Sequence, residues 1–115
     1  MSNEFRVMTS GAFTAAYKAL IPQLEQLTGK TIVTVTTSIG TGDTSIPNRL
    51  KRGEVADLVI VADGVLRQFI ADGYVQNEGA TIIARSMMGF AVRAGAPDPK
   101  IRTADDLRKA LLAAK

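Results

Sequence analysis

The sequence predicts an α/β fold, a parallel three-layer sandwich lobe in which helices cover both faces of one sheet. β-branched runs and helix-like runs alternate from residue 4 to residue 73 in the order strand, helix, strand, helix, strand, helix. The third strand-like run, residues 58–62 (LVIVA), is unbroken and apolar, which is typical of a strand buried on both faces. Short connections between such units favour parallel strands that lie side by side, joined by right-handed crossovers.

The first strand and the first helix are separated by a single glycine, Gly11. Residues 4–10 (EFRVMTS) are strand-like, and residues 12–29 carry apolar side chains at helical spacing. Pro22 stands inside this helix and predicts either a kink or a new turn at its own position. Gly29 is a suitable residue for the end of the helix.

The second strand and the second helix enclose a loop of glycines and hydroxyl side chains. Residues 30–38 alternate β-branched side chains with threonines, as strands do. Residues 39–45 (IGTGDTS) form the loop. The helix over 46–53 has Pro47 in its first turn and Gly53 at its end, which is the favoured asymmetry for these two residue types.

Two more helices are predicted further along the chain. Residues 64–73 have an amphipathic pattern that ends at Gly73. Residues 103–115 begin with Thr103 as the N-cap and with Asp106 three positions later, where a capping box has its acidic residue.

The pattern changes after Gly79. Two strand-like runs, 81–86 and 87–95, follow each other with no helix between them. We therefore expect two domains: a first lobe over residues 1–79 and, over residues 80–115, crossover strands and the first helix of a second lobe.

The composition excludes several kinds of chemistry. The chain of 115 residues has no cysteine and no histidine, so disulfides, thiolate nucleophiles, Ser-His-Asp triads and the common Cys or His metal sites are ruled out. We therefore expect no metal and no cofactor, and we assign no residue as catalytic. Any acid-base chemistry would fall to Asp, Glu, Lys, Tyr or backbone groups.

Neither nucleic acid nor membrane is an expected partner. The net charge is +3, and the densest basic cluster is Arg49, Lys51 and Arg52. This cluster has no interleaved aromatic residues, so it predicts a solvated helix end that complements the helix dipole. No apolar run approaches the roughly 18 residues that cross a bilayer, and the chain does not begin with a signal peptide pattern.

Ligands of an open parallel sheet bind at the carboxyl ends of its strands. Three loops follow the predicted strands: 9–12, 38–45 and 62–64. Hydroxyl groups and free backbone N–H groups at such helix starts can hold an anion, but the same residue types also cap helices, and both interpretations stay open. The residues expected to line a ligand site are Ser10, Gly11, Ala12, Thr41, Gly42, Asp43, Thr44 and Asp63.

Within this set, Ser10 and Thr44 would donate hydroxyl hydrogen bonds, and the glycines and Ala12 would offer backbone N–H groups. The G-x-G of the second loop is not a dinucleotide fingerprint, because Ser45 stands where the third glycine belongs and Asp43 would repel a phosphate. Asp63 stands at the carboxyl end of its strand, where it could also be an N-cap. Asp57 stands at the amino end and is expected to be structural.

Three stretches of the chain resemble the periplasmic molybdate-binding protein family, which belongs to the type 2 periplasmic solute-binding superfamily. They are LTGKTIVTV, RGEVADLVIVAD and MMGFAVRAGAPDPKIRTADDLRKALLAAK. The resemblance covers the N-terminal half of such proteins. It implies an ABC-transporter substrate-binding role, with a permease as partner and a periplasmic location, although the absent signal peptide leaves a cytoplasmic location open.

The resemblance also implies a two-lobed clamshell that holds a small anionic or polar solute between its lobes. The ligand-binding serines of the family fall near Ala12 and near Asp43 and Thr44 of this chain. Relative to the family, this chain loses one hydroxyl at Ala12 and gains a carboxylate at Asp43, and these departures favour an organic ligand with a hydroxyl or amino group over molybdate. A complete clamshell needs about twice this length, so the fold is expected to be incomplete in this chain, or completed by a second copy in a homo-oligomer.

Two other functions stay open on the same fold. One is an isomerase that acts on small carboxylic acids, with Asp43 or Asp63 as base. The other is the effector-sensing domain of a transcription regulator. Fold alone does not decide among them.

Overall fold

The structure, a computed structural model, describes residues 3–114. The chain divides into two units, Met1–Ala80 and Thr81–Lys115.

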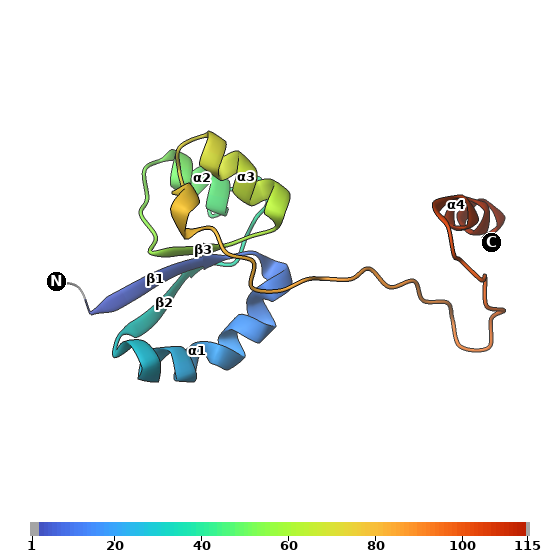
Figure 1. The fold of residues 1–115 in the computed structure, drawn as a ribbon, viewed down its shortest axis with the longest axis horizontal. Helices are drawn as coiled ribbons and strands as arrows, with labels where there is room; N and C mark the ends of the chain where they lie inside the picture. The colour runs from blue at the N-terminus through green and yellow to red at the C-terminus, as the bar shows by residue number, and fades with distance from the viewer. Residues whose placement is uncertain (1–2, 115) are drawn as a thin grey trace. The chain divides into compact units, whose positions relative to one another are not determined.

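The first unit is built on a parallel sheet of three strands (Figure 1). The strands are β1 (Glu4–Thr9), β2 (Thr31–Thr36) and β3 (Leu58–Ile60). Their order is β2-β1-β3, so β1 is the central strand: the first crossover runs from β1 to β2, and the second passes over β1 to β3 on its other side. The α/β class and the three adjacent parallel strands predicted from the sequence are confirmed.

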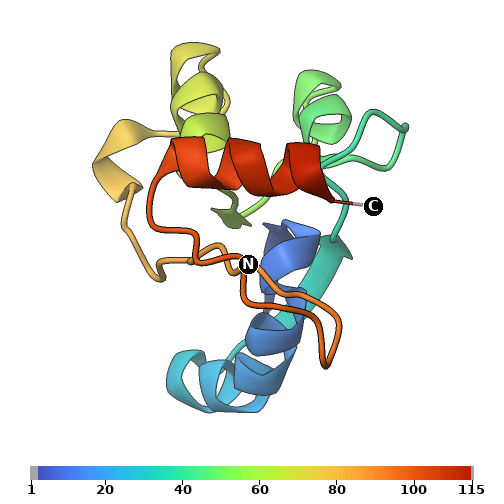
Figure 2. The same cartoon turned by 90° about the vertical axis from the view of Figure 1, so that its right-hand side faces the viewer.

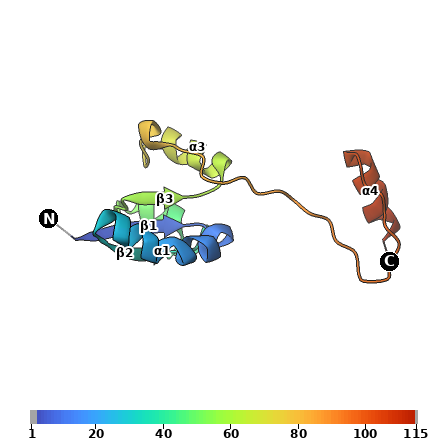
Figure 3. The ribbon, with the colours of Figure 1, turned by 60° about the horizontal axis from the view of Figure 1, so that its bottom comes forward.

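Helices cover both faces of this sheet (Figures 1 and 3). Helix α1 (Thr14–Thr28) lies on one face, and α2 (Ile46–Lys51) and α3 (Asp63–Ala71) lie on the other. Helix α1 continues through Pro22 as a single element, so no new turn begins at the proline. It ends at Gly29, whose φ of 66° is the left-handed conformation that glycine adopts without strain.

The main core lies between the sheet and the pair α2 and α3. Four buried side chains form it: Met8, Ile46, Leu50 and Phe69. Partly buried valines of β2 and β3 pack against them. Burial of this apolar surface is the principal stabilising contribution to the unit, and it positions the loops at the carboxyl ends of the strands.

Burial of β3 on both faces, expected from its apolar sequence, is wrong. Val59 packs against the core, but its neighbour Leu58 is 40% exposed. Successive side chains of a strand point to opposite faces, so Leu58 lies on the face that α1 covers. Two features leave Leu58 exposed on this face. The strand β3 is at the edge of the sheet, and α1 is hydrogen-bonded through Tyr17 to β2, which lies on the other side of β1.

The second unit holds α4 (Ala104–Ala113), which Figure 2 shows as a regular helix. Its capping box is confirmed: the Asp106 N–H donates to Thr103 Oγ1, and the Thr103 N–H donates to Asp106 Oδ2, both at 3.1 Å. Among the described residues, no helix is long and apolar enough to cross a membrane.

The two strands expected over 81–86 and 87–95 are not formed. A strand requires a neighbour that accepts and donates its ladder hydrogen bonds, and the structure assigns no strand between residues 81 and 103. The assignment of residues 80–115 to a second lobe stays a prediction.

Candidate functional site

The carboxyl ends of the three strands meet, as the parallel sheet requires. The Ser10 N–H donates to the carbonyl of Ile60 at 2.8 Å, which joins the end of β1 to the end of β3. A Cβ atom placed on Gly11 would lie 3.5 Å from the carbonyl oxygen of Thr37. The first predicted loop is therefore hydrogen-bonded to the last residue of β3 and lies close to Thr37, which follows β2.

The first loop contains a short 3-10 helix, Gly11–Phe13, with Ser10 as its N-cap. The carbonyl of Ser10 accepts bonds from the Phe13 N–H and from Thr14 Oγ1, both at 3.2 Å. Its hydroxyl makes no capping bond. Within residues 3–114, the N–H groups of Gly11 and Ala12 donate to no acceptor. Capping therefore does not occupy the Ser10 hydroxyl.

Residues 39–44 of the second loop, here named the donor loop, are all exposed. No acceptor among residues 3–114 is bonded to any of their six N–H groups. In contrast, the carbonyls of Thr41, Gly42 and Thr44 all accept hydrogen bonds. The carbonyl groups and the N–H groups of this loop therefore differ. Three carbonyls are hydrogen-bonded to the protein, whereas the N–H groups are left to solvent or to a ligand.

The helix α2 supplies most of the donors to these carbonyls. Asn48 Nδ2 lies 2.9 Å from the Thr41 oxygen and 3.1 Å from the Gly42 oxygen. Arg49 Nε lies 3.0 Å from the Thr44 oxygen. Neither side chain was among the predicted site residues, because their role depends on where the loop folds back over α2.

A second arginine contact stabilises this arrangement. Arg49 Nη1 lies 2.9 Å from Glu54 Oε2, and Arg52 Nη2 lies 3.3 Å from Glu54 Oε1. The hydrogen bond from Arg49, with the one from Arg52, holds the pKa of Glu54 below its ordinary value of 4.5. The basic cluster predicted as a solvated helix end is therefore partly an ion-pair network.

Ser45, at the end of the same loop, is a buried residue that the sequence did not single out. It is the N-cap of α2, is fully buried, and has a hydroxyl with no partner in the described chain. A serine before a helix-starting Ile-Pro predicts a capping hydroxyl, so nothing in the sequence indicated burial without a hydrogen bond.

The three aspartates at positions 43, 57 and 63 have different surroundings. Asp63 is the first residue of α3, and Ala62 is the N-cap, so the N-cap interpretation of Asp63 is wrong. Its exposed carboxylate pairs with Arg67 at 2.8 Å. Asp57 accepts a 2.7 Å bond from the Arg6 N–H at the amino end of the sheet, which confirms its structural role. Asp43 has no ion-pair partner in the part of the chain described.

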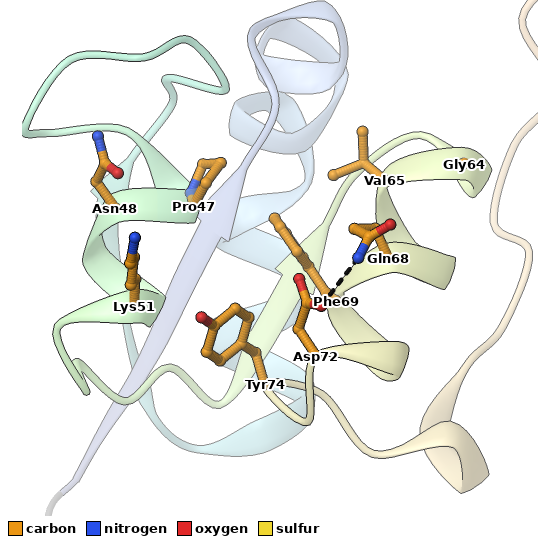
Figure 4. A pocket seen from close by; sticks show the side chains of 9 residues that line it. All are labelled: Pro47, Asn48, Lys51, Gly64, Val65, Gln68, Phe69, Asp72 and Tyr74. Atoms are coloured by element: carbon orange, nitrogen blue, oxygen red, sulfur yellow. Dashed lines mark hydrogen bonds between the residues drawn. The ribbon is translucent and has the colours of Figure 1, made fainter.

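A groove of about 490 Å³ lies between α2 and α3 (Figure 4). No residue predicted for the site lines it. Tertiary packing of α2 against α3 creates this groove, so no local sequence motif predicts it. Its lining residues are Pro47, Asn48, Lys51, Gly64, Val65, Gln68, Phe69, Asp72 and Tyr74. Across residues 3–114, no group of three or more acidic side chains could hold a metal ion.

Comparison with known proteins identifies the family. The profile of the family described as bacterial extracellular solute-binding protein matches residues 5–114. A protein named aconitate isomerase, from Pseudomonas sp, is 33% identical over 106 residues, which are 91% of this chain and 40% of that protein. No solved structure matches the chain significantly. These matches do not identify a molybdate-binding subtype, but the family match covers nearly the whole sequence. This chain belongs to the bacterial extracellular solute-binding proteins.

Proposed function

We propose that this chain binds a small organic acid, one that carries a hydroxyl or amino group, at the carboxyl edge of its sheet. Binding of a small solute is the role of its family. The observation that carries the proposal is the donor loop, whose six N–H groups have no acceptor within residues 3–114 while α2 binds its carbonyls. Successive backbone N–H groups of this kind make an anion-binding concavity.

The residues of the first loop would complete this side of the site. The N–H groups of Gly11 and Ala12 would bind the carboxylate, and the hydroxyls of Ser10 and Thr44 would donate to it. The position of Gly11 supports this, because a Cβ atom placed on it would lie 3.5 Å from the carbonyl oxygen of Thr37, the residue just before the second loop.

Asp43 supports the choice of an organic acid over a simple oxyanion. A carboxylate without an ion pair would repel a dianion, but it accepts a hydrogen bond from a hydroxyl or an ammonium group. Asp63 belongs to the proposed site only at its margin, since Arg67 already neutralises its charge.

The transport role is the remaining part of this proposal. A protein that binds a solute outside the cytoplasm would deliver it to a permease of an ABC transporter, and we propose a periplasmic location on the family description. A second set of contacts to the ligand would come from a second lobe or from a second copy of the chain.

Thermal unfolding against a panel of lactate, malate, citrate, serine and sulfate tests the binding proposal, with the mass in solution measured alongside. A hydroxy or amino acid that binds the folded state raises Tm in a concentration-dependent manner. We expect Tm to rise with at least one of them and to rise less with sulfate. If the folded chain shows no rise with any member, the proposed function is wrong.

A carboxylic-acid isomerase is the second candidate, and the similarity to aconitate isomerase is the observation that favours it. The chain spans 40% of that protein's length. Here Asp43 would be the base, since Asp63 is paired with Arg67. Conversion between cis- and trans-aconitate that is lost in Asp43→Asn and retained in Asp63→Asn would support this candidate. The absence of any conversion by wild-type protein that binds aconitate would exclude it.

A further inference from the structure

The donor loop is held in place from outside, by side chains of α2. Asn48 Nδ2 donates to two successive carbonyls, Thr41 at 2.9 Å and Gly42 at 3.1 Å. A primary amide has two N–H donors on one nitrogen, so a single side chain can satisfy both. The Ser45 N–H also donates to Gly42, at 2.9 Å.

The next residue of α2 holds the other end of the loop. Arg49 Nε donates to the Thr44 carbonyl at 3.0 Å, and the same carbonyl accepts a 2.7 Å bond from Thr36 Oγ1. The guanidinium is itself held by Glu54, and the Arg49 side chain is only 22% exposed. Consecutive residues of one helix thus bind both ends of a four-residue segment, 41–44.

This arrangement affects ligand affinity through loop order. Fixing a residue in a single backbone conformation costs conformational entropy. A loop that the protein already holds does not need to be ordered by the ligand, so binding is tighter for the same contacts. The bonds from Asn48 to the carbonyls of Thr41 and Gly42 also fix two peptide planes, and therefore the directions of the N–H groups of Gly42 and Asp43.

We propose that Asn48 is a positioning residue of the donor loop, assisted by Arg49, and that it raises affinity for organic acids without touching them. This inference rests on the function proposed above. It concerns residues outside the predicted ligand site, since an Asn on a helix next to the loop has no motif of its own.

The test compares variants by calorimetric titration with lactate, malate, citrate and serine as probes. In Asn48→Ala we expect about tenfold weaker binding of whichever probe the wild type binds, as expected when a ligand must order the loop itself. Arg49→Lys keeps the charge beside Glu54 but removes the Nε donor, so we expect a smaller loss. It also serves as the second variant if Asn48→Ala does not fold.

Gln68→Ala is the matched control. Gln68 is also a side-chain amide on a helix, it donates to Asp72 Oδ1 at 2.9 Å, and it makes no bond to the donor loop. Tm and the ¹⁵N heteronuclear NOE of residues 41–44 are measured for every variant. A residue that only stabilises the fold would lower Tm and leave affinity unchanged once the folded fraction is accounted for.

The outcomes separate this inference from the proposed function. Weaker binding and a lower NOE in residues 41–44 of Asn48→Ala, with both unchanged in Gln68→Ala, support the inference. Binding by Asn48→Ala as tight as by wild type overturns the inference and leaves the proposed function intact. Failure of the folded wild type to bind any of the four probes overturns both.

Discussion

The hydroxyl groups of Tyr17 and Thr34 lie 2.9 Å apart and join α1 to β2. Tyr17 is 1% exposed, so its hydroxyl has no access to bulk water. This hydrogen bond ties α1, the helix that follows the first loop, to the face of the sheet on which it packs.

Removal of this hydroxyl is expected to destabilise the chain. Tyr17→Phe leaves Thr34 without its partner and should lower the free energy of unfolding by about 1 kcal/mol, measured by urea denaturation. Tyr74→Phe is the control, because Tyr74 is 40% exposed and its hydroxyl makes no hydrogen bond among residues 3–114. Equal losses in the two variants would contradict a specific role for the Tyr17 bond.

Two glycines of the first unit should respond in opposite directions to alanine. Gly53 has φ of 85°, so Gly53→Ala should destabilise the chain by about 1–2 kcal/mol. Gly64 lies in α3 with no atom within 4 Å of an added Cβ, so Gly64→Ala should stabilise it by roughly 0.4–1 kcal/mol through the unfolded state. Thermal unfolding measures both, and a stabilising Gly53→Ala would show that this backbone is not strained.

The buried hydroxyl of Ser45 contributes nothing to folding that we can identify. An unpaired buried polar group is unfavourable, so Ser45→Ala should leave Tm unchanged or raise it. Thr36→Val is the comparison, because its hydroxyl donates to Thr44 and accepts from the Ser38 N–H, and its loss should cost about 1 kcal/mol. A marked fall in Tm for Ser45→Ala would mean that its hydroxyl has a partner in solution.

The ion-pair network of α2 predicts a pH dependence. The pKa of Glu54 is lowered in the folded state by its hydrogen bonds from Arg49 and Arg52. A lowered folded pKa gives stability that is fully present above the unfolded pKa, near 4.5, and that is lost as pH falls through the folded value. The Tm difference between wild type and Glu54→Gln should therefore shrink below about pH 4.5. A difference that stays constant down to the acid transition would contradict this.

The elements with strong local patterns were predictable. The three strands follow β-branched runs, Gly29 ends α1, and Thr103 with Asp106 opens α4, because each depends on neighbours in the sequence. The strands expected over 81–95 failed, because an apolar run becomes a strand only where a second strand pairs with it.

The candidate site was predictable only in outline. Parallel strands bring their ends together, so the proximity of Gly11 to Thr37 could be anticipated. The bonds of Asn48 and Arg49, the burial of Ser45 and the groove between α2 and α3 depend on tertiary packing. The N-cap of α3 is Ala62 and not Asp63, so that prediction was wrong by one residue. Helix boundaries are uncertain by about one or two residues even when a structure is at hand.

One measurement tests the central claim most directly: ¹H–¹⁵N NMR titration of the chain with lactate, malate, citrate and serine. For each probe that binds, the account predicts that the largest amide shifts are at Gly11, Ala12 and residues 39–44. Shifts confined to the groove residues 64–74, or no saturable shift with any probe, would contradict the claim that the donor loop binds the solute.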